Sequence, residues 1–337
     1  TIDAMAVFNP FVPSFKANPY LQYGRLRNED PVHRSIAMQA WILTRYEDCI
    51  AVLRDATTFS SDGRNAGGQL GDVIREQRAQ SPLGEAQTLL SIDPPAHTRM
   101  RGIVNRVFTP RRVEALRPRI EEIATELLDA APNWGGFELM AGLAQPLPVI
   151  VIAELLGIPP EDQDRFKTWS NALAATTDVM NSEAVLNDAR ETTIELIDYF
   201  GRFVNERRAA PRDDLISALV AAEEAEQLTT DEILAFAILL LVAGNETTTN
   251  LIGNGTLALL EHPEVAAQLR ANPSAIPAAV EEMLRFDSPV QAVVRIARES
   301  AVVGGKQIDQ GDVLMMMLGA ANHDPAQFRE PDRFEPA

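Results

Sequence analysis

The fold of this chain is decided by one stretch, Ala243-Gly244-Asn245-Glu246-Thr247-Thr248-Thr249-Asn250. It follows the uncharged apolar run 233–243, and more apolar residues follow as far as Leu260, so the pattern predicts one long buried helix over residues 231–260. An acid and several hydroxyls in such a helix cost free energy unless something uses them. Glu246 and Thr247 together could pass a proton through ordered water to a reacting group. A structural role fits equally well, in which the threonine bonds back to its own helix and the glutamate pairs with a base.

Composition and charge limit the class of protein. The chain has 337 residues, of which 46% are hydrophobic and 23% are charged, as in ordinary globular proteins. Its net charge of -18 argues against nucleic-acid binding and against docking on anionic membranes, because both rely on basic surfaces. The run 233–243 is too short to span a bilayer, and the first residues carry no signal-peptide pattern. A soluble cytoplasmic protein is therefore expected, without an intramolecular disulfide because Cys49 is the only cysteine.

Helical spacing of apolar residues dominates the rest of the sequence. Helices are predicted over residues 20–28, 46–54, 97–107, 110–130, 143–156, 162–174, 183–208 and 277–286. Strands are predicted as a pair within 32–44 and as short segments at 293–294, 302–303 and 313–318, with a turn at Gly304-Gly305. Residues 60–87 are rich in Gly, Ser and Gln with weak periodicity, which favours a loop. We therefore expect a mainly α fold with a small β portion, in a single domain over residues 1–337.

Three further patterns place charged side chains where they could carry chemistry. Glu282 and Arg285 are three residues apart and share a helix face, as a solvated surface pair also would. His97 and Arg101 share a face near a helix N-terminus, which suits an anionic group but equally describes an ordinary basic surface. Arg295 is a charge within an apolar strand, where it either binds an anion or points to solvent. None of these patterns is specific by itself.

The signals occur in an order that is known from one family. The sequence resembles the soluble bacterial class of cytochrome P450 haem-thiolate monooxygenases. The matching segments are Asp93-Pro94-Pro95-Ala96-His97-Thr98-Arg99-Met100-Arg101, Phe108-Thr109-Pro110-Arg111-Arg112-Val113, Ala243-Gly244-Asn245-Glu246-Thr247-Thr248, Glu282 to Arg285, Ala321-Asn322-His323-Asp324-Pro325, Phe328 and Pro331-Asp332-Arg333-Phe334. They span most of the sequence, so the resemblance implies a cytochrome P450-like fold.

The resemblance also implies a role for each matching residue. The long helix would cross the distal face of haem b, where protons would be delivered to bound dioxygen by Glu246 and Thr247. The oxygen pocket would be bordered by Ala243 and Gly244. The haem propionates would be held by His97, Arg101 and Arg295. A buried structural network, stable only if every member is satisfied, would consist of Glu282, Arg285 and Arg333.

The implied reaction inserts one oxygen atom of O2 into an apolar organic substrate and reduces the other to water. Electrons would come from NAD(P)H through a separate ferredoxin and reductase. The ferredoxin could dock on a basic cluster formed by Arg99, Arg106, Arg111 and Arg112. Ordinary surface arginines explain this cluster equally well. Segments 60–90 and 166–185 correspond to the substrate-covering parts of the family. Candidate pocket residues, each of which also fits ordinary core, are Leu173, Met180, Leu240, Val242, Val293 and Val294.

One part of the family pattern is missing from these residues. The family's axial iron ligand is a cysteine thiolate in a loop beyond the Pro-Asp-Arg-Phe segment, and the thiolate favours O–O cleavage. This cysteine is expected beyond Ala337, so the 337 residues are expected to be incomplete at the C-terminal end. Cys49 is predicted to pack as a small buried hydrophobe, and His323 is not at a ligand position. The alternative is a haem-free, cytochrome P450-like binding or scaffold protein.

Overall fold

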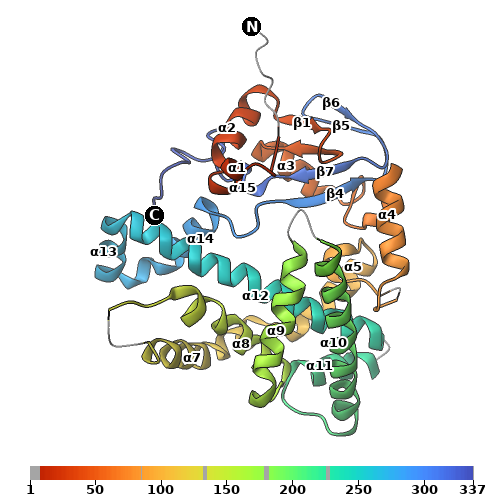
Figure 1. The fold of residues 1–337 in the computed structure, drawn as a ribbon, viewed down its shortest axis with the longest axis vertical. Coiled ribbons are helices and arrows are strands. Elements are labelled where there is room, and N and C mark those ends of the chain that lie inside the picture. The colour runs from red at the N-terminus through yellow and green to blue at the C-terminus, as the bar shows by residue number, and fades with distance from the viewer. Residues whose placement is uncertain (1–7, 85, 132–134, 178–181, 225–227, 337) are drawn as a thin grey trace. The chain divides into compact units, whose positions relative to one another are not determined.

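The computed structural model describes residues 8–84, 86–131, 135–177, 182–224 and 228–336 (Figure 1). The chain divides into two compact units: unit 1 comprises residues 1–76 and 254–337, and unit 2 comprises residues 77–253. The strands that are described all lie in unit 1, whereas the described part of unit 2 is helical. The predicted mainly α fold with a small β portion is therefore confirmed. That the two units form a single domain stays a prediction.

Unit 1 is built around a mixed sheet with the strand order β1-β2-β7-β4-β3. Its strands are β1 (Val32–Ser35), β2 (Ala40–Leu43), β3 (Phe59–Ser60), β4 (Val293–Ala297) and β7 (Val313–Met316). Strand β2 pairs with β7 in parallel, and the other pairs are antiparallel. Successive side chains point to opposite faces, so Ile42 and Val313 join one apolar cluster while Leu43 and Leu314 join another. A separate hairpin of β5 (Ala301–Val303) and β6 (Lys306–Ile308) turns at Gly304-Gly305, as predicted.

Short helices pack on both faces of this sheet. Helix α2 (Tyr20–Glu29) contributes Tyr23 and Leu26 to the cluster of Ile42, and α3 (Tyr46–Arg54) contributes Cys49 and Val52 to the cluster of Leu43. These two helices confirm the predictions over 20–28 and 46–54. The remaining helices of unit 1 are α1 (Pro13–Ala17), α13 (Pro263–Ala271), α14 (Ile276–Phe286) and α15 (Leu318–Ala321).

The segment 60–87 departs from the predicted loop. It contains α4 (Gly68–Ala79), which extends across the boundary between the units. Leu70 and Ile74, four residues apart, pack against the cluster of Ile42. Two apolar residues at helical spacing are enough to hold this helix by tertiary packing, although the local composition favours a loop.

Unit 2 is a bundle of helices around one large apolar cluster (Figure 1). Its helices are α5 (Ala96–Val107), α6 (Pro110–Ala115), α7 (Arg117–Asp129), α8 (Pro146–Leu156), α9 (Gln163–Ala174), α10 (Glu183–Ala209), α11 (Leu215–Glu224) and the first part of α12 (Thr230–Glu261), which belongs to unit 1 from Asn254 onward. A π-helical turn precedes α8 at Met140–Ala144. Short 3-10 turns in the two units occur at Gly63–Asn65, Leu89–Ser91, Pro160–Asp162, Ala175–Thr177 and Pro273–Ala275. The helix predicted over 110–130 is two helices, because Pro118 stands in the first turn of α7 and a proline cannot continue a preceding helix.

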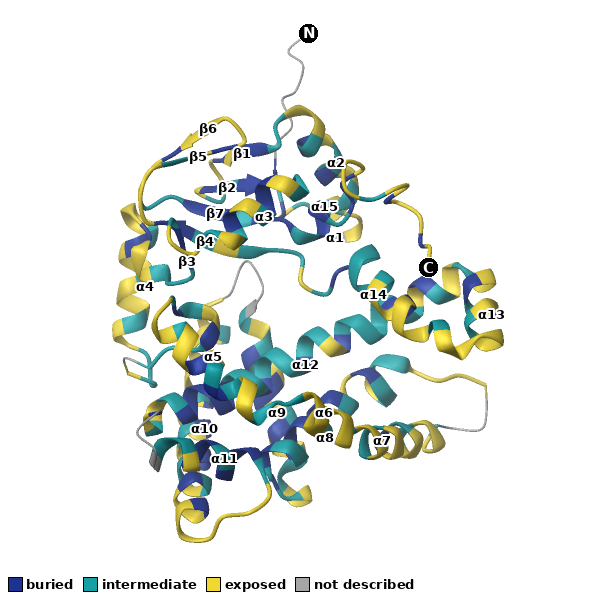
Figure 2. Ribbon diagram, turned by 180° about the vertical axis from the view of Figure 1, so that it is seen from behind, coloured by how far each residue is buried: buried dark blue, intermediate teal, exposed yellow. Residues whose placement is uncertain are grey.

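Helix α12 was expected to be buried along its whole length, and the structure differs. Residues 233–238 and Leu241 are buried in the core cluster of unit 2, whereas most residues after Val242 are half-buried (Figure 2). At 32 residues the helix is long and apolar enough to cross a membrane by length and composition alone. Its first half packs inside the core of unit 2. A buried core helix of a soluble protein meets the same length and composition test as a membrane-spanning helix.

A buried ion pair joins the ends of three helices in unit 2. Arg207 of α10 is 1% exposed and its Nε atom donates to Asp214 Oδ2 at 2.6 Å. The same guanidinium donates to the carbonyl oxygen of Gly157, which ends α8 with φ at +74°. Asp214 Oδ1 accepts from the Ser217 backbone N–H at 2.8 Å in the first turn of α11. A charge buried so completely requires this pairing, since an isolated ion in the interior is costly.

Candidate active site

Thr247 and Ala243 form the centre of the candidate site on α12. The Thr247 hydroxyl donates to the Ala243 carbonyl oxygen at 2.8 Å, one helical turn earlier. At 3.6 residues per turn, Ala243, Glu246 and Thr247 share one face of the helix, and all three are half-buried. The back-bond expected for a structural threonine is thus present. It holds the hydroxyl proton toward the helix and leaves the oxygen able to accept a hydrogen bond on the face that carries Glu246.

Gly244 faces α8. A Cβ atom on Gly244 would approach the Cδ1 atom of Ile152 to 2.7 Å, and Ile152 belongs to the core cluster of unit 2. The close packing of α8 on α12 therefore accounts for a residue without a side chain at this position. Its role at the border of an oxygen pocket stays a prediction.

Helix α12 also carries two buried polar residues, Asn245 and Thr249, to which the sequence patterns assigned no role. Asn245 donates through its side-chain amide to the Ser170 hydroxyl of α9 at 2.5 Å. Thr249 donates to the carbonyl oxygen of Ala144 at 2.9 Å. The signal that could have found them is their spacing of four residues, which puts both on one face of an otherwise apolar helix.

Helix α5 carries two of the residues assigned to an anionic group. His97 lies half-buried in its first turn, and Arg101 is exposed one turn later. Within the described ranges, neither side chain has a hydrogen-bond or ion-pair partner. Arg99, between them, instead pairs with Glu232 of α12. Burial alone would raise the pKa of Glu232, but hydrogen bonds from Arg99 and Thr229 outweigh it, and the net shift of this pKa is downward.

Unpaired donors on one face of α5 are what a bound carboxylate requires, and the helix N-terminus favours negative charge. His97 and Arg101 therefore fit the propionates of a haem group. The other residue assigned to this task, Arg295, lies half-buried in β4 of unit 1, where its Nη1 atom donates to the Val294 carbonyl oxygen at 2.8 Å.

The candidate pocket residues are mostly parts of apolar clusters. In unit 2, Leu173 is buried, and Leu240 and Val242 pack partly buried against the same cluster. In unit 1, Val293 packs against the cluster of Leu43, whereas Val294 is 45% exposed. Met180 lies outside the described residues.

Glu282 and Arg285 form a two-point ion pair on α14, with contacts of 2.7 and 2.8 Å. Arg285 also donates to three backbone carbonyl oxygens in the segment after α15 (Leu318–Ala321), those of Asn322, Pro331 and Arg333. The expectation of a buried Arg333 side chain needs correction. Its guanidinium is 61% exposed and pairs with Glu330 and Glu335, so Arg333 enters the network through its carbonyl group alone. The physical reason is that the Glu282 carboxylate is already satisfied by the Arg285 guanidinium and the Glu335 backbone N–H, so Arg333 pairs with other carboxylates at the surface.

No thiolate ligand is available from the described residues. Cys49 is buried in unit 1, and burial raises the pKa of its thiol to about 12, which opposes formation of a thiolate. Both ring nitrogens of His323 are engaged, with Asp332 and with the Phe286 carbonyl oxygen. In the part of the protein that the structure describes, no group of three or more His, Cys, Asp or Glu side chains could hold a metal ion.

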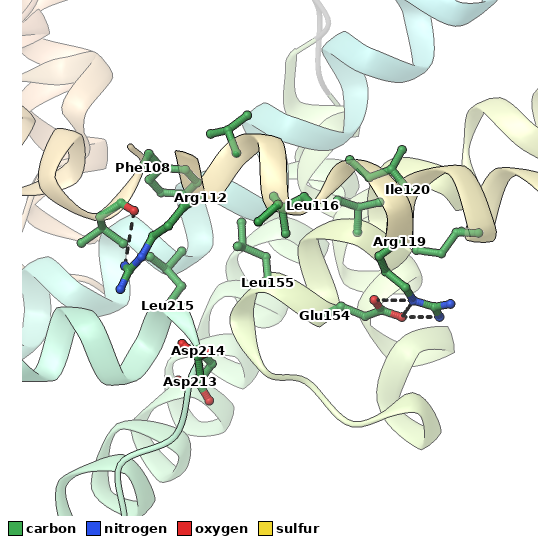
Figure 3. A pocket seen from close by; sticks show the side chains of 15 residues that line it. Phe108, Arg112, Leu116, Arg119, Ile120, Glu154, Leu155, Asp213, Asp214 and Leu215 are labelled. Carbon is green, nitrogen blue, oxygen red and sulfur yellow. Dashed lines mark hydrogen bonds and ion pairs between the residues drawn. The ribbon is translucent and has the colours of Figure 1, made fainter. Parts of the chain in front are cut away.

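A cavity of about 370 Å³ in unit 2 is lined by Arg112 of the basic cluster (Figure 3). Apolar side chains of α6, α7 and α8 line it, with the Arg119–Glu154 ion pair on one side and Asp213 on another. No predicted catalytic or cofactor-binding residue lines this cavity.

Comparison with known proteins identifies the family. The family model for cytochrome P450 matches residues 165–337. The polyketide biosynthesis cytochrome P450 PksS of Bacillus subtilis (strain 168) is 40% identical over 335 residues, which cover 97% of this chain and 81% of PksS. The vitamin D(3) 25-hydroxylase of Pseudonocardia autotrophica is 41% identical over 331 residues, which cover 96% of this chain and 78% of the hydroxylase.

Solved structures agree with the sequence relatives. The structure of PksS superimposes with a TM-score of 0.87 at 40% identity, covering 98% of this chain and 82% of that one. P450BioI, solved in complex with an acyl carrier protein, has a TM-score of 0.86 at 35% identity, with 96% of this chain and 82% of that one covered. The 337 residues thus span about four-fifths of the length of these relatives. The chain belongs to the cytochrome P450 family and is a cytochrome P450 monooxygenase.

Proposed function

We propose that this protein uses haem b to insert one oxygen atom of O2 into an apolar organic substrate, and that Glu246 and Thr247 deliver the protons for this reaction. The observation that carries the proposal is the Thr247 hydroxyl, held at 2.8 Å from the Ala243 carbonyl oxygen beside Glu246. On a half-buried helix face, an acid and an oriented hydroxyl supply a short proton path to a bound reactant.

The haem, when bound, would activate O2 for insertion into a C–H bond. His97 and Arg101 would bind its propionates from α5. Glu246 would take protons from solvent, and the Thr247 oxygen would accept a hydrogen bond from an ordered water and hold that water in line. Ala243 keeps the face open because a methyl group leaves room beside the helix.

An apolar substrate is supported by the side chains assigned to the pocket. Leu240 and Val242 on α12 are aliphatic, so a polar substrate beside them would lose hydrogen bonds to water without replacement. Two of the relatives are named for a polyketide pathway and for vitamin D(3), which are consistent with a largely apolar substrate.

The proposed electron source is NAD(P)H, through a ferredoxin and its reductase in the cytoplasm. Helices α5 and α6 present three exposed arginines, Arg106, Arg111 and Arg112, on a protein of net charge -18. Such a basic patch steers an acidic partner and raises its association rate. The fourth predicted member, Arg99, is paired with Glu232 and contributes less. Arg111→Glu should weaken reduction by ferredoxin more than Arg190→Glu, the same change on α10.

The test of the haem assignment is the carbon monoxide difference spectrum of the reduced protein, measured on the complete product of the gene that encodes these residues. A Soret band typical of thiolate ligation is expected. A folded complete product that takes up no haem would refute the proposal. His97→Ala combined with Arg101→Ala should lower haem retention during gel filtration, whereas Arg190→Ala should not.

A further inference from the structure

A buried polar link ties α12 to α9 behind the candidate site. The side-chain amide of Asn245 donates to the Ser170 hydroxyl at 2.5 Å, and these residues are 6% and 0% exposed. The two lie 75 residues apart in the sequence. Breaking the bond would leave two buried polar groups unsatisfied, which costs more than the loss of a surface hydrogen bond. The link therefore fixes how α12 is rotated against α9.

Thr249 braces the same face one turn later. Its hydroxyl donates to the Ala144 carbonyl oxygen at 2.9 Å and lies 3.3 Å from Asn245 Oδ1. Ala144 ends the π-helical turn before α8, and four residues further on stands Pro148, which has no N–H to donate to this carbonyl. The Thr249 hydroxyl supplies the donor that a proline at this position cannot.

The Asn245 amide and the Thr247 hydroxyl occupy opposite faces of one helix, whereas Thr249, three residues after Glu246, lies about 60° around the helix from it. Successive residues of an α-helix are about 100° apart, so Asn245 lies about 160° around the helix from Thr247. Burial agrees with this geometry, since Asn245 is buried while Thr247 is half-buried. Any rotation of α12 permitted by loss of the link would turn the Glu246 and Thr247 side chains by the same angle.

We propose that Asn245 is a positioning residue: its bond to Ser170, braced by Thr249, sets the direction in which Glu246 and Thr247 face. Because Ser170 belongs to α9, a displacement of α9 alters this direction. Helix α9 lies largely within the segment 166–185 assigned to covering the substrate, so the link makes proton delivery sensitive to how the substrate is held. This inference rests on the function proposed for Glu246 and Thr247.

Ser170→Ala tests the inference because it removes only the acceptor of the Asn245 amide. Two quantities are measured: hydrogen exchange of the amides over residues 241–250, and the amount of product formed per NAD(P)H consumed by the complete gene product. Exchange should accelerate by roughly tenfold, the effect of losing one net hydrogen bond, and product yield per NAD(P)H should fall. Thr248→Ala is the matched control, because Thr248 is exposed on the same helix between the two faces.

Exchanging the partners provides a rescue. The double variant Ser170→Asn with Asn245→Ser keeps one amide and one hydroxyl at the contact, and should recover both readouts in part. If Ser170→Ala does not fold, Asn245→Ser alone takes its place. The inference would be overturned if the folded variant shows the same amide exchange and the same product yield per NAD(P)H as the wild type. Asn245 would then have only a packing role, even if the melting temperature of the variant is lower. Thr247→Ala separates the two claims. If this variant forms as much product per NAD(P)H as the wild type, the proposed function itself fails. If it forms less product per NAD(P)H while Ser170→Ala does not, only the positioning claim fails.

Discussion

The buried pair of Arg207 and Asp214 gives the sharpest prediction for the fold of unit 2. Their side chains are 1% and 6% exposed, and the contact measures 2.6 Å. Arg207→Met preserves most of the apolar stem but leaves the Asp214 carboxylate buried without its cation. Removing one partner of such a pair costs about 3–5 kcal/mol. For a protein of this size, roughly 2–4 °C is lost per kcal/mol, so the melting temperature should fall by roughly 6–20 °C.

Thermal and urea unfolding followed by circular dichroism measure this effect. Arg190→Met, at an exposed site on the same helix, is the control and should remain within about 0.5 kcal/mol of the wild type. Asp214→Asn retains the acceptor for the Ser217 N–H. The double variant Arg207→Met with Asp214→Asn should therefore be less destabilised than the sum of the two single variants. An Arg207→Met protein as stable as the control would refute the reasoning.

Three further predictions concern unit 1. Burial raises the pKa of Asp48 in the folded protein, so the charged carboxylate opposes folding at any pH above its pKa in the unfolded chain, about 4. Asp48→Asn should therefore raise the melting temperature at neutral pH. Melting temperatures measured in a pH series should show this gain shrinking as the pH falls toward 4. Arg285→Lys should destabilise unit 1 almost as much as Arg285→Ala, because an ammonium group cannot reach Glu282 and three carbonyl oxygens at once as the guanidinium does. In limited proteolysis the two variants should be cleaved at similar rates. A Lys variant that resists the protease as well as the wild type does would contradict this. Cys49 should resist thiol reagents at pH 8 in the native protein and react after denaturation, since burial raises the pKa of its thiol to about 12; rapid labelling of the native protein would be the contrary result.

Local pattern was sufficient for much of the fold. The alternation of apolar residues over 32–44 and the helical spacing over 46–54 predicted elements that the structure contains at nearly the same positions. The prediction failed where packing with distant residues decided the outcome. Helix α4 forms because Leu70 and Ile74 meet a cluster built from strands far along the sequence. Pro118 could have been read as a helix boundary, and it divides α6 from α7.

The candidate site was predictable only in part for the same reason. Glu246 and Thr247 stand out because an acid and an alcohol are conspicuous in an apolar helix. Asn245 is equally polar, but its partner Ser170 is 75 residues away and no spacing rule connects them. Arg333 shows the reverse case, since a motif assigned its side chain to a network that it joins only by its carbonyl oxygen. A motif identifies residue types and their order, whereas the geometry of their contacts requires the folded protein.

The central claim is that Glu246 and Thr247 together deliver protons in the monooxygenase reaction, with the Thr247 oxygen holding the water in line. Its most direct test is the ratio of product formed to NAD(P)H consumed, measured for the complete gene product and for its Thr247→Ala and Thr248→Ala variants. We expect Thr247→Ala to keep consuming NAD(P)H while forming less product and more hydrogen peroxide, and Thr248→Ala to match the wild type. An unchanged ratio in Thr247→Ala would contradict the account.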